Sequence, residues 1–326
     1  MLTRKEFESL VIPHLDAGRA PALPCFEIVL FYDTPRTTLA DGLAVVLQRF
    51  LDFAERRRPE TKLRWYRSNT MKASAAMSAG PGEMVDAFLG GPEFAKPGIA
   101  GLTLHGGEAA NAPVAPAFSL LSLDTAEDAA EPVHRTMLRL CLPPSEVDEG
   151  RELFELAAAC AAAQAVSCGY AGYSWFSSTG DTRMERSFGE RRGLLVKHPA
   201  MGYHDPLSYH PFIGEGLIQT GWLTILGPSL LKQAEDAKAL VFPQDSGVGV
   251  SRLDGKGVIL VAGPEPILGS RDPAQAAALA PYHAVGSRLA FLSLSDEDAE
   301  FLDFAGDPDD EAKVEWYRRF FGDGGT

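Results

Sequence analysis

The chain has 326 residues, of which 45% are hydrophobic and 23% are charged, so it can bury a large core without support from metals or disulfides. Its formal net charge is −14, from 44 acidic and 30 basic residues. A field of this sign repels phosphate backbones, which argues against nucleic acid as a direct ligand. It attracts basic partners, although many soluble proteins are acidic for solubility alone.

Two further features indicate the compartment. The four cysteines form no C-x-x-C pair and lie in apolar stretches, which is typical of buried free thiols: Cys25, Cys141, Cys160 and Cys168. The first residues reach an acidic side chain before any apolar run, and no stretch approaches the roughly 18 apolar residues of a spanning helix. We expect a cytoplasmic protein without membrane contact.

The first predicted elements form a strand–helix–strand unit. Residues 25–32 read as a strand. In the helix that follows, Thr38 and Asp41 have the spacing of a capping box, and apolar residues recur on one face until Arg56-Arg-Arg58. Residues 61–67 alternate like a second strand.

The same order of elements occurs again further along the chain. Residues 134–142 read as a strand, Ser145 and Asp148 as a capping box before an alanine-rich helix, and 166–176 as another strand. Between the two units, 80–111 is rich in Gly, Pro and Ala and is predicted to be a loop with one short helix at 83–89. We therefore expect a single domain, 1–326, whose halves, 20–125 and 130–321, are related.

The last third contains different elements. A strand over 221–226 leads into a helix from Ser229 to Ala239, and Asp254-Gly255 joins two strands, 248–252 and 257–262, into a hairpin. Three helices complete the chain, at 274–285, 296–304 and 311–321. The predicted fold class is α+β, with two strand–helix–strand halves packed together and a C-terminal hairpin and helices.

Motifs for catalysis are scarce. The densest group of potential metal ligands is His198, His204, Asp205 and His210, but its spacing is not the H-x-x-x-H of a zinc hydrolase helix. A metal-dependent hydrolase built on these four residues remains an alternative. No G-x-S-x-G elbow and no phosphate-binding glycine loop occur, so we expect no enzyme activity, no metal and no cofactor.

One charged segment stands out. Ten acidic residues lie between positions 296 and 315, opposed only by Lys313: Asp296, Glu297, Asp298, Glu300, Asp303, Asp307, Asp309, Asp310, Glu311 and Glu315. Acidic residues are favoured at helix starts, which accounts for part of this segment. The other interpretation is a negative surface that mimics phosphates and occupies a basic groove.

Four sequence landmarks, in order, resemble a bacterial family of type VI secretion immunity proteins, typified by those that neutralise VRR-Nuc-type nuclease effectors. They are Gly169-Tyr-Ala-Gly172, His198-Pro-Ala-Met-Gly-Tyr-His-Asp205, Gly221-Trp-Leu-Thr-Ile-Leu-Gly-Pro-Ser-Leu-Leu231 and Trp316-Tyr-Arg-Arg-Phe320. The strand at 26–32 with its helix is similar too. Most of the apolar landmark residues are expected to be packing residues.

The resemblance implies a cytoplasmic antitoxin that binds a cognate effector toxin and blocks its active site without catalysis. A nuclease needs a basic active-site groove, so the acidic residues from Asp296 to Glu311 are the predicted toxin-binding residues. A third possibility is an adaptor that loads an effector without inhibiting it.

Overall fold

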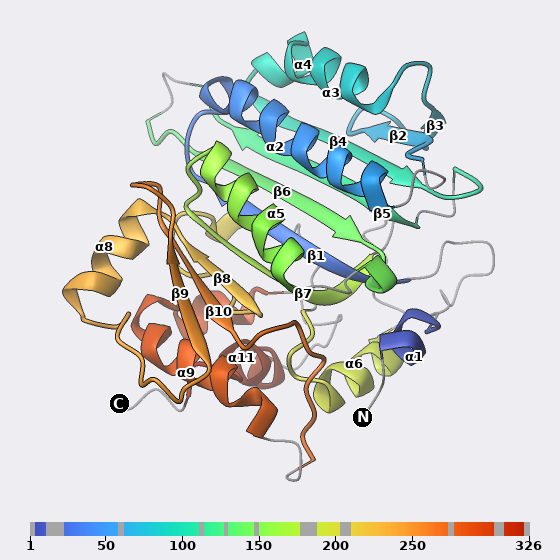
Figure 1. Ribbon diagram of the computed structural model, residues 1–326. Coiled ribbons are helices and arrows are strands. Elements are labelled where there is room, and N and C mark those ends of the chain that lie inside the picture. Colours follow the sequence, from blue (N-terminus) through green and yellow to red (C-terminus); the bar gives the residue numbers. More distant parts are fainter. Residues whose placement is uncertain are drawn as a thin grey trace.

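The computed structural model describes residues 4–10, 23–57, 62–110, 114–126, 130–146, 150–176, 188–202, 210–272, 277–302 and 310–322. Its ten strands form one sheet in the order β3-β2-β4-β5-β6-β1-β7-β8-β10-β9 (Figure 1). Every pairing between neighbouring strands is antiparallel. The strands are β1 Leu23–Tyr32, β2 Trp65–Ser68, β3 Ala75–Ala76, β4 Gly98–Gly106, β5 Val114–Asp124, β6 His134–Leu142, β7 Cys168–Phe176, β8 Leu223–Leu226, β9 Val248–Arg252 and β10 Val258–Ala262.

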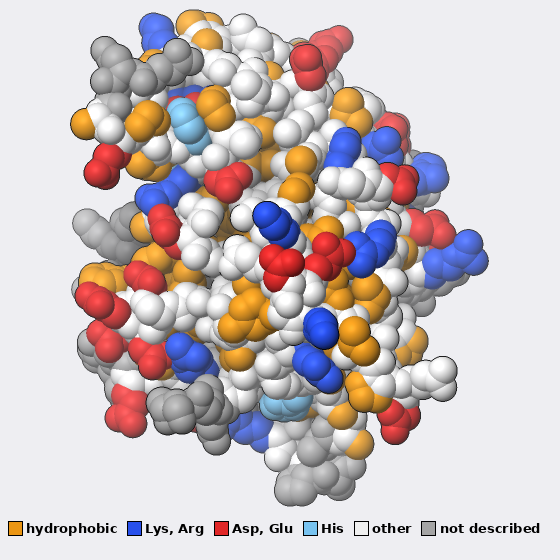
Figure 2. Space-filling model, turned by 90° about the vertical axis from the view of Figure 1, so that its left-hand side faces the viewer, with side chains coloured by type: hydrophobic (Ala, Val, Ile, Leu, Met, Phe, Trp, Pro, Cys, Tyr) orange, Lys and Arg blue, Asp and Glu red, His pale blue; other side chains and the backbone are white. Residues whose placement is uncertain are grey.

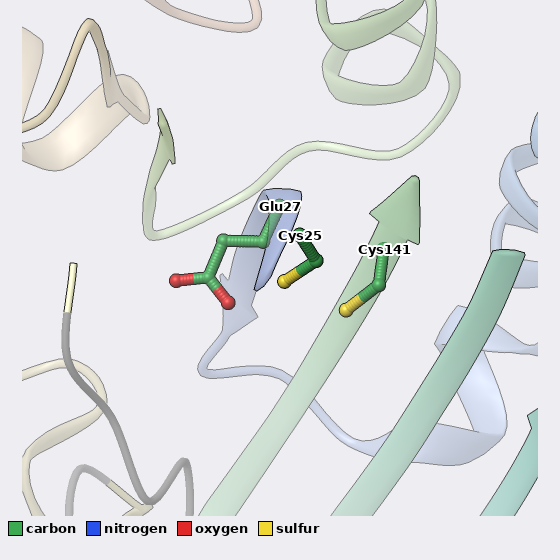
Figure 3. A group of neighbouring side chains, drawn as sticks. All are labelled: Cys25, Glu27 and Cys141. Carbon is green, nitrogen blue, oxygen red and sulfur yellow. The ribbon is translucent and has the colours of Figure 1, made fainter. Parts of the chain in front are cut away.

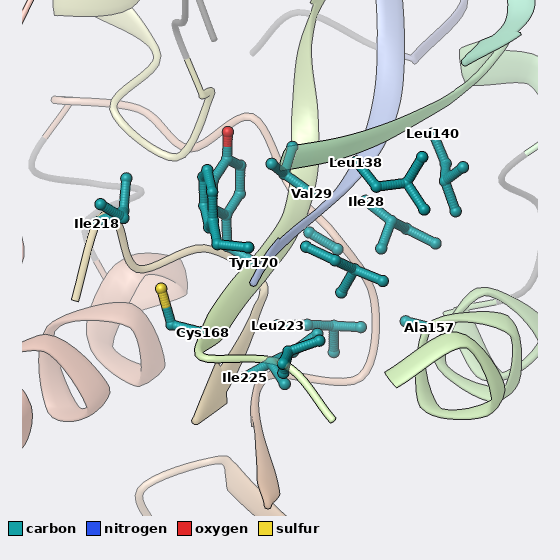
Figure 4. Close-up of a cluster of buried hydrophobic side chains, with 14 of the residues drawn as sticks. Ile28, Val29, Leu138, Leu140, Ala157, Cys168, Tyr170, Ile218, Leu223 and Ile225 are labelled. Atoms are coloured by element: carbon teal, nitrogen blue, oxygen red, sulfur yellow. The ribbon is translucent and has the colours of Figure 1, made fainter. Parts of the chain in front are cut away.

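Strand β1 lies in the middle of the sheet and, apart from Glu27, carries apolar side chains on both faces. It pairs with β6 on one side and β7 on the other, so that Ile28 faces both Leu140 and Ala171. Successive side chains of a strand point to opposite faces, and here both faces are covered. Figure 4 shows Ile28 and Leu140 on the side of helix α5 (Gly150–Ala163), with Tyr170 and Cys168 on the other side of the sheet.

Two long helices cover one face of the sheet. Helix α2 (Arg36–Arg57) and helix α5 (Gly150–Ala163) lie side by side across β6 and β1 (Figure 1). The predicted apolar stripe of α2 is confirmed, since Leu39, Leu43, Val46, Leu47 and Phe50 are all buried. Sequence periodicity therefore identified the face that packs on the sheet.

The predicted capping box of α2 is wrong. The helix begins at Arg36, so Thr38 lies in its first turn, where its hydroxyl donates to the carbonyl of Pro35. The carboxylate of Asp124, at the end of β5, accepts a hydrogen bond from the backbone N–H of Arg36 at 2.9 Å. A residue 88 positions away thus satisfies a donor that the helix itself leaves free. Of the second predicted box, Asp148 lies outside the described residues.

The remaining helices flank this body. Helices α3 (Pro81–Leu89) and α4 (Pro92–Ala95) pack beside α2, and α9 (Ala280–Leu289) packs against β9 and β10 on the opposite face of the sheet (Figure 1). The others are α1 Arg4–Glu8, α6 Phe188–Lys197, α8 Pro228–Asp236, α10 Asp296–Glu300 and α11 Asp310–Arg318, with 3₁₀ turns η1 Pro144–Glu146, η3 His210–Phe212 and η5 Ala290–Leu292. None of the described helices combines the length and apolar character needed to cross a lipid bilayer.

The prediction of a loop over 80–111 is wrong apart from its helix, α3. Strand β4 runs through this region and pairs with β2 and β5. Its glycine and alanine content suggested turns, but Ala100, Leu102 and Leu104 alternate along the strand and are buried. Pairing on both sides outweighs a weak local preference for strand. Strand β5, its neighbour, was not predicted.

The hairpin and the α+β class are confirmed. Strands β9 and β10 pair as expected, and Asp254 and Gly255 at their turn both have positive φ. The division into halves 20–125 and 130–321 within one domain stays a prediction. Strand β1, which would open the first half, lies between β6 and β7, the two strands of the second half.

Candidate functional site

The acidic segment forms two short helices that pack together. Helix α10 begins after Ser295, whose hydroxyl accepts a hydrogen bond from the backbone N–H of Asp298 and donates to the Asp298 carboxylate at 2.6 Å. This is a capped helix start with acids in its first turn, the arrangement that the helix dipole favours. Asp298 therefore has a structural role here, as one of the two sequence interpretations proposed.

Helix α11 fixes this pair to the body of the protein. Trp316, Tyr317, Phe320 and Phe321 are buried along and just after it. The Tyr317 hydroxyl donates to the carbonyl of Leu217 and accepts from the N–H of Leu294, both at 2.7 Å. Because α10 begins two residues after Leu294, this buried contact sets the position of the acidic residues of α10.

Among the acidic residues of this segment, exposure differs. Asp296, Glu297, Glu300, Glu311 and Glu315 are exposed, and Asp298 is half-buried. Asp296 is ion-paired with Arg318, a basic neighbour that the sequence interpretation did not count. Lys313 donates to the backbone carbonyl of Glu300 at 3.1 Å. Asp303, Asp307, Asp309 and the side chain of Asp310 lie outside the described residues.

An aromatic side chain completes this surface. Phe301 directly follows Glu300 at the end of α10 and is 72% exposed, the highest exposure of any large hydrophobic residue that the structure describes. Exposed aromatic residues beside charged ones are typical of the central contacts of protein interfaces. We name Glu297, Glu300 and Phe301 the α10 surface. A single phenylalanine in an acidic stretch gave no usable signal in the sequence.

Basic side chains border the acidic ones. A groove of about 710 Å³ beside α11 is lined partly by Arg271, Arg318 and Arg319. Arg319 is held in place by the carbonyl of Pro199 at 2.8 Å and by the ring of Trp316. The face shown in Figure 2 likewise has acidic and basic side chains interspersed with hydrophobic ones. The acidic residues of α10 and the start of α11 therefore have basic side chains next to them.

The predicted histidine group is only partly within the described residues, which exclude His204 and Asp205. The ring Nδ1 of His198 lies 2.9 Å from the carbonyl of Gly269, and the ring Nε2 of His210 lies 2.9 Å from the carbonyl of Arg135. Burial lowers the pKa of both rings. Each ring thus contacts a different part of the backbone as a neutral packed histidine.

Instead, the structure brings together three potential metal ligands that the sequence interpretation treated separately. Cys25 and Glu27 on β1 and Cys141 on β6 project from the same side of the sheet (Figure 3), and their ligand atoms lie within 4.8 Å of one another. All three side chains are fully buried. Burial, followed by the neighbouring Cys141 thiol, raises the pKa of Cys25 well above its usual value.

Arg139 lies beside these three residues. Its Nε is 2.6 Å from Oε2 of Glu27, and its guanidinium also donates to the carbonyl of Trp175. Burial by itself would lower the pKa of Arg139, but electrostatic interaction with the neighbouring Cys141 and Glu27 side chains more than offsets this, so the pKa is raised. One signal of this cluster was present in the sequence, because Cys25 and Glu27 are two residues apart on a predicted strand and therefore share a face.

The landmark residues of the sequence are packing residues. Trp222, Leu223, Leu226, Trp316 and Phe320 are all buried. Glycine is needed where two segments of the backbone approach closely, because a Cβ at Gly227 would lie 1.8 Å from the carbonyl oxygen of Val166. These buried residues stabilise the fold and are not available to contact a partner.

One antiparallel sheet with helices on both faces places the chain among α+β proteins. Residues 45–320 match the TsiV family, type VI immunity for VRR-NUC, and the chain belongs to this family. The fold resembles that of the Pseudomonas aeruginosa T6SS protein PA0821, with a TM-score of 0.71 and 18% identity over 92% of this chain and 85% of that one. No curated protein gives a significant match.

Proposed function

We propose that this chain is a cytoplasmic immunity protein that binds and blocks a cognate type VI effector, a nuclease, without catalysis. The observation that carries the proposal is the family match, which runs from within α2 through strands β2 to β10 and includes the α10–α11 region. Nuclease as the effector class follows from the description of the family. Sequence motifs for enzyme activity are scarce, in keeping with a role in binding.

We assign the main effector contact to the α10 surface. A nuclease binds the phosphates of its substrate with basic residues, so its groove complements exposed carboxylates. Among the predicted residues, Asp296 and Asp298 already bond within the chain, whereas Glu297 and Glu300 are exposed beside Phe301. Because α11 anchors this surface, little ordering would be required on binding.

The remaining predicted acids belong to the same proposed contact. Glu311 is exposed at the start of α11, and Asp303, Asp307, Asp309 and Asp310 lie in or next to the stretch that joins the two helices. Their negative charge would increase the rate of encounter with a basic groove even without direct contact.

The test uses the type VI effector that we expect to be encoded beside the gene for this chain, a nuclease of the VRR-Nuc class if the family description applies to it. Co-expression should relieve killing by that protein, and the two should co-purify. In a DNA cleavage assay, adding this chain at an equimolar amount should abolish cleavage. Absence of association at micromolar concentration in low salt would refute the proposal for that effector.

The same assay separates the alternatives. An adaptor would form the complex and leave cleavage unchanged. A metal-dependent hydrolase built on the histidine group would retain a metal ion that His204→Ala removes, together with an activity of its own.

A further inference from the structure

We propose that Cys25, Glu27 and Cys141 form a buried binding site for one zinc ion, in the middle of the sheet and separate from the α10 surface. The strands hold the three ligands in place. Cys25 and Glu27 occupy alternate positions of β1, and Cys141 is the direct partner of Glu27 on β6. All three side chains therefore share one face of two hydrogen-bonded strands (Figure 3).

The distances suit zinc. In a tetrahedral site with Zn–S of about 2.3 Å and Zn–O of about 2.1 Å, neighbouring ligand atoms are roughly 3.4–3.8 Å apart. The two sulfurs and one oxygen of the Glu27 carboxylate already lie within 4.8 Å of one another. Small side-chain rotations would bring them to the required spacing without moving the strands.

Glu27 has one oxygen available for a metal. Its Oε2 is bonded to Arg139, whereas Oε1 is buried and has no hydrogen-bond partner among the described residues. A carboxylate that binds a metal through one oxygen usually bonds a neighbouring residue through the other, and this contact orients it. Arg139 occupies that second position here.

The charges favour a divalent ion. Two thiolates and one carboxylate carry three negative charges, and zinc together with Arg139 carries three positive ones. Without metal, two neutral thiols and the Glu27–Arg139 pair are also neutral overall. A fully buried cluster is stable only when its charges balance, and this cluster balances in both states. Thiolate ligands select zinc over magnesium or calcium.

A fourth ligand position lies toward β7. Ser174 pairs directly with Cys25, so both point to the same face, and its buried hydroxyl has no hydrogen-bond partner among the described residues. Either this hydroxyl or a water molecule next to it would complete the tetrahedron.

Because all three ligands are fully buried, the ion would enter during folding and leave only on unfolding. The full-length chain should therefore be unfolded in guanidinium with a reductant and refolded with either zinc or a chelator. Metal content would be measured by elemental mass spectrometry after gel filtration. Refolding with cobalt would report thiolate ligation by its charge-transfer absorption in the near ultraviolet.

We expect about one zinc ion per chain after refolding with zinc, a higher melting temperature than the chelator-refolded protein, and a cobalt–thiolate band. Cys141→Ser should lose all three. Cys160→Ser, which changes a buried thiol of α5 outside the cluster, should keep them. His204→Ala should also keep them, which separates this site from the histidine group.

Three results would overturn the proposal. The first is wild-type protein that refolds to its native circular dichroism with zinc but retains none. The second is a cobalt complex without a thiolate band. The third is a Cys25–Cys141 disulfide in the native protein, detected as a mass lower by two hydrogens. The wild-type measurements decide the question even if Cys141→Ser fails to fold.

Discussion

Reversing two charges on the α10 surface is the most direct test of how this protein binds its effector. The change is Glu297→Lys with Glu300→Lys. Both carboxylates are exposed, and neither forms an ion pair within the part of the chain that the structure describes. Their replacement should therefore leave the fold intact, with a cost of about 0.3–1 kcal/mol from the lysine in the first turn of α10.

The expected loss of affinity follows from Coulomb's law. A carboxylate about 4 Å from a basic group in water contributes about 1 kcal/mol, and a lysine there turns this attraction into a repulsion of similar size. Each site would then change the binding free energy by about 2 kcal/mol, and the pair by about 4 kcal/mol at low salt, a weakening on the order of a thousandfold. Physiological salt should reduce the effect, because screening acts over about 8 Å.

The assay is binding of the cognate effector to the immobilised immunity protein, with association rates measured at low and physiological salt. The matched control is Glu83→Lys with Asp86→Lys on α3, which has the same spacing and the same charge change on exposed positions. Helix α3 lies at the opposite end of the molecule from α11 (Figure 1). Equal affinity losses in both variants would show that only net charge matters and would refute a contact at α10.

Three further predictions concern single contacts. Phe301→Ala should weaken effector binding by about 2 kcal/mol. Because Phe301 is 72% exposed, the melting temperature of the variant should differ little from that of the wild type. Unchanged affinity would show that Phe301 lies outside the interface. Arg139→Met should lower the free energy of unfolding in urea by about 3–5 kcal/mol, because it leaves the Glu27 carboxylate buried and unpaired. The double variant with Glu27→Leu should recover much of this loss. Losses that simply add in the double variant would contradict the reasoning. Burial lowers the pKa of His198 and His210 in the folded protein. Below about pH 6.5 the unfolded chain therefore binds protons at these residues more readily than the folded protein does. Their contribution to the free energy of unfolding should be fully present above about pH 6.5 and should decrease as the pH falls below it. The variant His198→Asn/His210→Gln should show a flatter dependence between pH 7.5 and 5.5, and parallel curves would show that other groups are responsible.

The type and extent of many elements could be predicted from the sequence, because helix and strand periodicity are local properties. Strand β6 was predicted at 134–142, where it is observed, and the buried face of α2 was read from its apolar spacing. Prediction failed at β4, because composition suggested a loop and strand pairing is not local. The order of landmarks along the chain was enough to indicate the family, since such residues preserve a shared packing arrangement.

Contacts between distant residues were decided by the tertiary structure alone. The sequence indicated an acidic segment, but only the fold pairs Asp296 with Arg318 and exposes Phe301 beside Glu300. Likewise, Cys141 lies beside Cys25 and Glu27 because β6 pairs with β1, although these two strands are far apart in the sequence. Strand order depends on which pairing buries the most apolar surface over the whole molecule, and no short stretch of sequence contains that information.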